Sequence, residues 1–292
     1  MKKALSFVLL LVSSFILSSC SDSDDSDKKG KEERVVLEHK KKDIEEEKIF
    51  CFSDVEFYEL KDIKEPSGIV FDKERNSLFV VSDEGSVHEI SPDGKLLKSK
   101  KEIGGDLEGI TIDSQSGLLY VAVENEEKIL EIKPDDLSIK REFYISRQFE
   151  GKTVLEEGGN GIEGIHYDNQ TESLFVVNQA LDSKKEADAS ALLEIEFPES
   201  KLSSGSVLEI IGYHPFDIND LSAITQKEKA GLYIISDENN KLLYFSFATN
   251  EYEEICDLQG DDQEGIAFDE SGNIFIAQDS GGVAKMSTSN KP

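Results

Sequence analysis

The sequence contains no tryptophan, three cysteines and four histidines among its 292 residues. The cysteines form no CxxC pair, which excludes a disulfide-rich scaffold and a zinc cluster of paired thiolates. Basic residues are also scarce, because 32 Lys and Arg stand against 61 Asp and Glu, giving a formal net charge of −29. A surface this acidic is repelled by nucleic-acid phosphates and by anionic lipid headgroups. We therefore expect no nucleic-acid partner, but solubility or an affinity for cations.

The usual signatures of catalysis are missing as well. The chain has no P-loop, no Gly-x-Ser-x-Gly elbow and no HExxH motif. His88 and His214 stand near the ends of expected strands without an acid–base partner in the sequence, and His39 precedes the repeats described below. His166 alternates with apolar neighbours, which predicts a structural histidine packed between sheets. No nucleophile–base pair can be assigned from the sequence.

The N-terminus has the pattern of a bacterial lipoprotein signal. Lys2 and Lys3 precede an apolar run over residues 4–17, and small residues then lead to Cys20. This predicts a signal peptide over residues 1–19, lipidation at Cys20 and attachment to a membrane through the acyl chains. The alternative is an ordinary signal peptide in which Cys20 is incidental.

Residues 20–49 are predicted to form a charged, flexible tether. The segment is rich in Ser, Asp, Lys and Glu and cannot bury enough apolar surface to order itself. An acidic run directly after a lipidated cysteine resembles the surface-export signal of Bacteroidetes lipoproteins. We expect a cell-envelope lipoprotein of the outer membrane that is exposed at the cell surface.

From residue 50 onward one unit occurs five times. The copies are residues 65–72 (EPSGIVFD), 106–113 (DLEGITID), 161–168 (GIEGIHYD), 220–227 (DLSAITQK) and 262–269 (DQEGIAFD). A polar turn and a second apolar run follow each copy, at residues 77–81, 118–122, 173–177, 231–235 and 273–277. The Gly or Ala of successive copies is 41, 55, 59 and 42 residues apart. This spacing, with β-branched and aromatic residues in short runs, is typical of an all-β propeller.

We therefore predict a five-bladed β-propeller over residues 50–292. The last copy lacks a fourth strand, whereas residues 55–63 precede the first copy where a fourth strand would lie. The N-terminal strand is expected to complete the last blade and so to close the ring. A sixth blade inside the two longer intervals is the alternative.

The repeated Glu-Gly-Ile and Ser-Gly-Ile units, with their second strands, resemble the SdiA-regulated family, also called YjiK-like. The resemblance extends roughly over residues 50–286. It implies a five-bladed propeller distantly related to NHL repeats, with a calcium site in its central region. It implies no particular reaction.

Acidic residues recur in phase with the repeat. Because the first strand of each propeller blade lines the axis, residues at one repeat position form a ring. The residue before the Gly or Ala is Glu108, Glu163 and Glu264 in three copies and serine in two. In the two serine copies an acid stands two residues earlier, at Glu65 and Asp220. The sequence thus predicts five carboxylates at one mouth of the axis.

Converging carboxylates raise one another's pKa unless a cation lies between them. Several hard oxygen ligands without clustered His or thiolate favour Ca²⁺ over other metals. The polar ends of the second strands could add further ligands. The alternative is that these acids are solvated charges of a generally acidic surface.

Two of the cysteines could pair. Cys51 and Cys256 belong to comparable outer positions of adjacent blades, so an oxidising compartment would allow a disulfide between them. Two separate buried thiols are the alternative.

The sequence favours a non-catalytic, monomeric, lipid-anchored protein. Its propeller would bind Ca²⁺ in the central channel and present one face to a small ligand or a protein. The alternative is a calcium-dependent hydrolase of the lactonase, esterase or phytase type, in which the ion would polarise the substrate or activate water.

Overall fold

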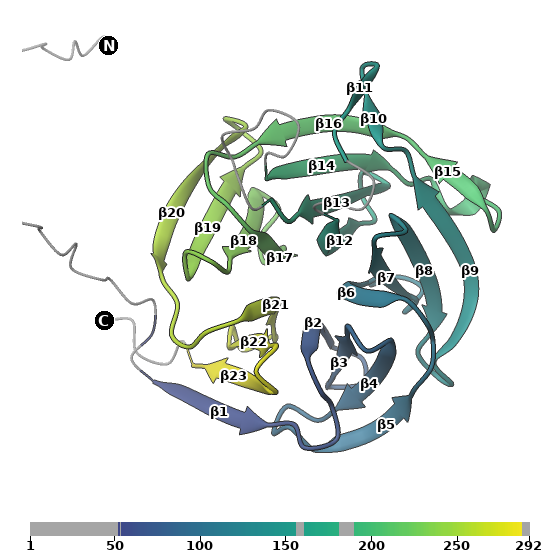
Figure 1. The fold of residues 1–292 in the computed structure, drawn as a ribbon. Helices are drawn as coiled ribbons and strands as arrows, with labels where there is room; N and C mark the ends of the chain where they lie inside the picture. Colours follow the sequence, from purple (N-terminus) through teal and green to yellow (C-terminus); the bar gives the residue numbers. More distant parts are fainter. Residues whose placement is uncertain (1–51, 53, 156–160, 181–189, 288–292) are drawn as a thin grey trace, which may run out of the picture. The chain divides into compact units, whose positions relative to one another are not determined.

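A computed structural model describes residues 52, 54–155, 161–180 and 190–287 of the chain. Five sheets are arranged around a central axis (Figure 1). Each contains four strands in antiparallel order, and one of the sheets has a fifth, parallel strand at its outer edge. The predicted all-β, five-bladed propeller is confirmed. The predicted signal peptide and tether lie outside the described residues. No helix among the described residues has the length and apolar character needed to cross a membrane.

The blades follow one another along the chain. Blade 1 consists of β2 (Pro66–Asp72), β3 (Ser77–Ser82), β4 (Ser86–Ile90) and β5 (Leu96–Lys100). Blade 2 consists of β6 (Asp106–Ile112), β7 (Leu119–Glu124), β8 (Lys128–Lys133) and β9 (Ser138–Ile145). Blade 3 consists of β12 (Ile162–Asp168), β13 (Ser173–Asn178), β14 (Ala191–Glu196) and β16 (Ile210–Pro215). Blade 4 consists of β17 (Leu221–Thr225), β18 (Gly231–Ser236), β19 (Lys241–Ser246) and β20 (Glu251–Asp257).

Blade 5 joins the two ends of the described chain, as the sequence predicted. It consists of β21 (Gln263–Phe268), β22 (Ile274–Gln278), β23 (Gly282–Met286) and β1 (Val55–Glu59). β1 is antiparallel to β23, with Val55 opposite Met286 and Glu59 opposite Gly282 (Figure 1). This pairing covers the outer edge of β23, which would otherwise offer free backbone groups to another chain.

The longer intervals contain small additions and, among the described residues, no sixth blade. One holds a hairpin of β10 (Gln148–Phe149) and β11 (Lys152–Thr153). The other holds a 3₁₀ turn at Glu199–Lys201 and β15 (Ser206–Leu208), which pairs in parallel with β9 of blade 2. The six-bladed alternative is therefore wrong.

The hydrophobic core lies between the blades. All six residues of β3 and of β13 are buried, because each inner strand is covered on both faces by neighbouring blades. One apolar cluster joins Phe79 of blade 1 to Leu107 and Val121 of blade 2. Another joins Phe275 of blade 5 to Val80 of blade 1 and to Leu60, just after β1. Each buried aliphatic side chain of this kind contributes about 1.5–3 kcal/mol relative to an exposed one.

Candidate functional site: a carboxylate cup on the propeller axis

The glycine of the repeat allows the inner strands to meet closely at the axis. A Cβ atom on Gly109 would lie 2.4 Å from the carbonyl oxygen of Glu163 in the next blade. A Cβ on Gly68 would lie 2.3 Å from the carbonyl oxygen of Glu108. Both contacts are with backbone, which cannot move aside easily. The repeat therefore needs glycine for close approach, and this brings the acids that precede it together.

Isoleucines fill the axis directly after these glycines. Five of them, one from each blade, are at most 5% exposed: Ile69, Ile110, Ile165, Ile224 and Ile266. The cavity that they line with the repeat glycines and Glu264 has a volume of only about 10 Å³. That is at the lower limit for a single water molecule. The acids at the start of the inner strands therefore lie above an apolar floor.

Glu163 is the most deeply placed of these acids. Glu163 is 6% exposed, and no hydrogen bond or ion pair joins its carboxylate to another described residue. Burial raises the pKa of Glu163 well above its ordinary value, and the charges of Glu108, Glu124, Glu264 and Asp220 raise it further. A buried carboxylate surrounded by like charges and lacking a donor is the arrangement that a cation would stabilise.

Glu108 lies in a compact group of three acids. Carboxylate oxygens of Asp106, Glu108 and Glu124 all lie within 4.8 Å of one another. Burial raises the pKa of Glu108 to about 9, with further contributions from the charges of Asp106, Glu264 and Glu124. The pKa of Glu124 is also raised by burial and by Asp106, although Glu124 accepts a 3.3 Å hydrogen bond from the Gly161 amide.

Glu264 and Asp220 belong to the other side of the same region. Burial raises the pKa of Glu264 to about 8, with contributions from Asp237 and Asp220. Burial also raises the pKa of Asp220, while hydrogen bonds from Gln179 and from the Glu238 amide oppose the shift. We use the name carboxylate cup for six residues: Asp106, Glu108, Glu124, Glu163, Asp220 and Glu264.

Glu65 belongs to a second group of acids. One carboxylate oxygen from each of Glu65, Asp83 and Asp279 lies within 4.8 Å of the other two. Burial raises the pKa of Asp83 to about 7, and the charges of Glu65 and Asp279 add to this. We call these three residues the rim triad. Of the five predicted carboxylates, Glu65 and Glu108 belong to these two different compact groups, and Glu163, Asp220 and Glu264 belong to neither group.

The two serines of the repeat have a structural role. Ser67 donates a hydrogen bond to the carbonyl oxygen of Leu107, and Ser222 donates one of 2.6 Å to that of Gln263. Each hydroxyl therefore connects its inner strand to the inner strand of the following blade. A serine whose hydroxyl proton is donated in this way supplies little negative charge to the cup.

Asp106 is a member of the cup that was not predicted from the sequence. It stands two residues before Glu108, where Glu65 stands before Ser67 and Asp220 before Ser222. The prediction used this position only in the two serine copies. The shared position was the available signal, and it applies also to Asp262. Glu124, by contrast, was expected among the polar ends of the second strands.

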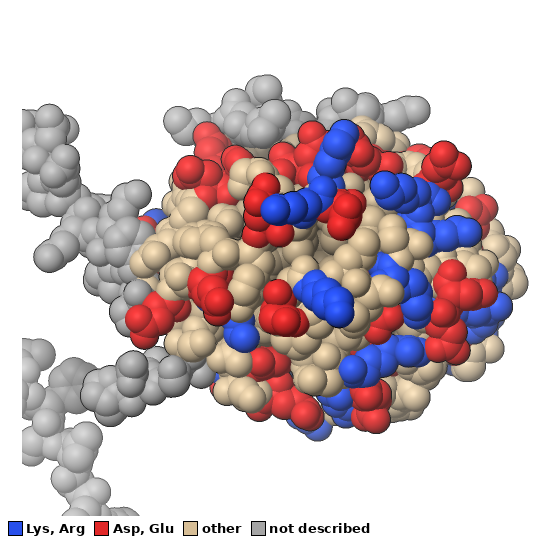
Figure 2. All heavy atoms as spheres, turned by 90° about the horizontal axis from the view of Figure 1, so that it is seen from below, with Lys and Arg blue, Asp and Glu red and all other residues tan. Residues whose placement is uncertain are grey.

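The side wall of the propeller differs from the cup. Around β1 and β5, acidic and basic side chains are interspersed among uncharged ones (Figure 2). Several of these charges pair, as Lys64 does with Glu84 at 3.1 Å and Lys98 with Glu89 at 3.1 Å. Acids without cationic partners gather at the axis instead. This contrast argues against reading the cup as general surface acidity.

The remaining candidates have ordinary roles or lie partly outside the described residues. His88 is 1% exposed and shares a 2.7 Å hydrogen bond with Ser86, and burial lowers the pKa of His88 to about 4. Burial likewise lowers the pKa of His166 to about 4, and its bond to Gln226 reaches from blade 3 to blade 4. Cys256 is disulfide-bonded, whereas Cys51, its predicted partner, lies outside the described residues, as does Cys20.

Comparisons with known proteins agree with this architecture. The family model described as SdiA-regulated matches residues 53–280. A glutaminyl cyclase from Myxococcus xanthus has a similar structure, with a TM-score of 0.57 at 15% identity over 82% of this chain and 97% of that chain. A virginiamycin B lyase from Staphylococcus aureus has a TM-score of 0.46 at 15% identity, over 80% and 99% of the two chains. No curated protein matches the chain. At these identities the structural likeness concerns the fold alone.

Proposed function

Because the chain belongs to the SdiA-regulated family, we propose that it is a lipid-anchored protein of the cell envelope whose propeller binds Ca²⁺ in the carboxylate cup. Lipidation at Cys20 would hold it on the outer membrane, exposed at the cell surface. The face around the cup would be presented to a small ligand or a protein. The ion would offset the repulsion between the carboxylates that the close packing of the inner strands brings together.

One observation supports this proposal above the others. Glu163 is almost fully buried, carries a carboxylate and has no donor among the described residues. The negative charges of four other acids raise the pKa of Glu163, and none of them can neutralise its carboxylate. Leaving such a group ionised without a cation would be costly, so the apo protein must keep protons there.

The donor set fits calcium. All candidate ligands are carboxylate oxygens, with no thiolate or imidazole among the cup residues. Ca²⁺ accepts six to eight oxygens in flexible geometry, whereas Mg²⁺ requires a tighter octahedron and gives up water reluctantly. Glu163, with Glu108, Glu124 and Asp106, would hold the ion from one side, and Glu264 and Asp220 would complete the negative environment. When bound, the ion would supply positive charge that keeps these groups ionised.

Titration calorimetry with Ca²⁺ tests this proposal. The wild-type protein, first stripped with a chelator, should bind Ca²⁺ saturably and more tightly than Mg²⁺. Glu163→Gln should weaken calcium binding by at least about tenfold, because it removes one charged ligand from the centre of the cup. Glu253→Gln is the matched control, since Glu253 is an exposed glutamate on the outer strand β20. Equal calcium affinities of the two variants would show that the cup is not the binding site.

A further inference from the structure

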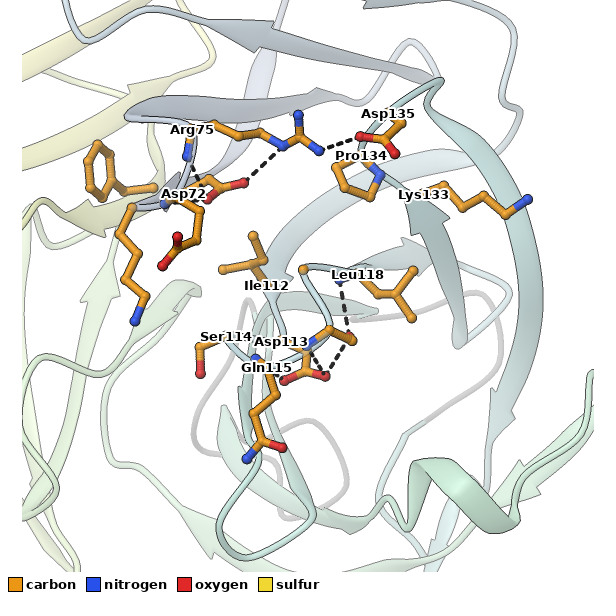
Figure 3. Close-up of a pocket in the computed structure, with 15 residues that line it drawn as sticks. Asp72, Arg75, Ile112, Asp113, Ser114, Gln115, Leu118, Lys133, Pro134 and Asp135 are labelled. Carbon is orange, nitrogen blue, oxygen red and sulfur yellow. Dashed lines mark hydrogen bonds and ion pairs between the residues drawn. The ribbon is translucent and has the colours of Figure 1, made fainter.

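A second concave site lies between blades 1 and 2, at the ends of the strands opposite the carboxylate cup (Figure 3). Its volume is about 560 Å³, which is within the range of small-molecule sites. Three turns line it: the turn between β2 and β3, the turn between β6 and β7, and the turn between β8 and β9. The proposed calcium function makes no use of this pocket.

The inner surface of the pocket is apolar. Phe71, Ile112 and Leu118 line it and are only partly buried, so each leaves apolar surface facing the space. Pro134 adds a further apolar wall from the turn between β8 and β9. Figure 3 shows Ile112 and Leu118 across the space from Arg75. A partly hydrated apolar concavity of this size favours a ligand with an apolar body.

Arg75 spans the pocket from one blade to the other. Its Nε lies 3.2 Å from Asp72 Oδ2 on blade 1, and its Nη2 lies 2.5 Å from Asp135 Oδ1 on blade 2 (Figure 3). Both carboxylates lie at N–H groups on the edge of the guanidinium, and the Asp135 side chain is 84% exposed, so that its ion pair with Arg75 lies at the surface. The flat faces of a guanidinium held in this way can still stack on an aromatic ring.

The buried acids of the lining are already satisfied. Asp72 accepts hydrogen bonds from the Glu74 amide at 2.9 Å and from the Arg75 amide at 3.2 Å. Asp113 accepts hydrogen bonds from the Gln115 amide at 2.9 Å and from the Ser116 amide at 3.2 Å. Neither carboxylate therefore requires a cationic ligand, and Arg75 is paired with two acids. The other charged lining residues, Lys73, Glu74 and Lys133, are exposed and carry both signs. No buried charge of the lining is left for a charged ligand to pair with, which favours an uncharged ligand.

We propose that this pocket binds an uncharged small molecule with an aromatic ring. The ring stacks on the guanidinium face of Arg75, and its body packs against Phe71, Ile112 and Leu118. Ser114 and Gln115, both exposed at the turn between β6 and β7, accept or donate hydrogen bonds to polar substituents of the ligand.

Indole is a suitable probe because the chain contains no tryptophan. Titrating the full-length protein into indole should change the indole fluorescence saturably, and saturation-transfer NMR should confirm the contact. Binding should be the same with calcium and with a chelator, because the pocket and the cup lie at opposite ends of the strands. Cyclohexylmethanol, an aliphatic alcohol of similar size, should compete much more weakly.

Two pairs of proteins make the test specific. Ser114→Phe places a bulky ring at the pocket and should abolish indole binding, whereas Ser271→Phe, at the corresponding turn of blade 5, should not. Arg75→Lys retains the charge but loses the planar group, and it should weaken indole binding by about 2- to 10-fold relative to wild type. Melting curves establish that each variant is folded.

Three results would overturn the proposal. The first is the absence of saturable indole binding to the wild-type protein, and the second is equal indole affinities of folded Ser114→Phe and Ser271→Phe. The third is displacement of indole by cyclohexylmethanol with an inhibition constant no larger than the dissociation constant of indole. The calcium proposal would be unaffected by any of them, because its residues and its readout are separate.

Discussion

Glu163 shows how one residue position combines two requirements. Its backbone carbonyl contacts the preceding blade so closely that Gly109 can carry no side chain, and its own side chain enters the cup. The sequence places an acid there next to the glycine that lets the inner strands approach closely, a position that is alanine in the fourth copy. Packing at the axis therefore concentrates charge, and charge at the axis then requires protons or a cation.

The apo protein should lose stability as the pH rises from 7 to 9. Over this range the carboxyls of the unfolded chain are fully ionised, whereas Glu108 and Glu264 have folded pKa values of about 9 and about 8. The folded state thus binds more protons than the unfolded state, so its stability falls as the pH rises through those values. His88 and His166, with pKa values of about 4, stay neutral in the folded protein throughout this range.

Thermal melts in chelator should reveal this as a Tm that falls by several degrees, since about 1 kcal/mol shifts Tm by roughly 2–4 °C in a domain of this size. Saturating Ca²⁺ should remove the decline, because it binds the ionised carboxylates. A Tm in chelator that is constant or rises between pH 7 and 9 would contradict the electrostatic account of the cup.

Gly109→Ala should destabilise the propeller by about 1–3 kcal/mol, because its Cβ would overlap the Glu163 carbonyl oxygen. Chemical denaturation of the two proteins measures the difference. Gly117→Ala is a useful control, since a Cβ at Gly117 meets nothing within 4 Å and only its positive φ of 75° opposes the change. An unchanged stability of Gly109→Ala would mean that close approach at the axis does not require the glycine of the repeat.

At the scale of elements, β1 is the strand on which ring closure depends. It pairs with β23 over five residues, and Leu60 and Ile63 after it are buried between blades 5 and 1. Residues 20–49 have the composition of a charged tether. Removing β1 would expose the edge of β23 and the apolar surface that Leu60 and Ile63 cover.

Two truncations separate these contributions. Deletion through residue 48 should leave the melting transition nearly unchanged, whereas deletion through residue 63 should cause unfolding or aggregation. Circular dichroism melts and size-exclusion chromatography compare the products. If the longer truncation is monomeric and melts like the shorter one, β1 does not close the ring.

The sequence predicted the blades because each one repeats the same local pattern. The Gly-Ile unit and its second apolar run mark the two innermost strands of every blade, and the short fifth copy indicated that β1 completes it. β15 could not be predicted, because three residues carry no period and its parallel pairing with β9 depends on distant packing. Arg141 on β9 connects the chain before β15 to blade 2. Its guanidinium lies 2.6 Å from the Glu131 carboxylate and donates a 2.8 Å hydrogen bond to the carbonyl oxygen of Leu202.

The candidate site was predicted less completely than the fold. Repeat phase identified Glu108, Glu163 and Glu264, because symmetry places equivalent positions around one axis. Repeat phase cannot give side-chain reach, so it did not show that Glu65 would join Asp83 and Asp279 rather than the cup. Asp106 was not predicted, although it occupies the same repeat position as Glu65 and Asp220, and the folded chain brings its carboxylate within 4.8 Å of those of Glu108 and Glu124.

At the scale of the whole molecule, the predicted anchor at Cys20 decides where the propeller works. Cys20→Ser should move the protein from the membrane fraction to a soluble fraction, because the thiol that accepts the lipid is gone. Cell fractionation followed by immunoblotting measures the change, with the wild-type protein as the control. Retention of the Cys20→Ser protein in membranes would contradict lipidation at this residue.

We propose that the carboxylate cup holds a calcium ion among its most buried acids, in a chain whose formal net charge is −29. The most direct measurement is the anomalous scattering from crystals of the wild-type protein grown with calcium. We predict a peak bounded by the carboxylates of Glu163 and Glu108, with Glu124 or Asp106 as a further ligand. A fully occupied peak at the rim triad alone, or no peak at the cup at a calcium concentration that saturates binding in solution, would contradict the account.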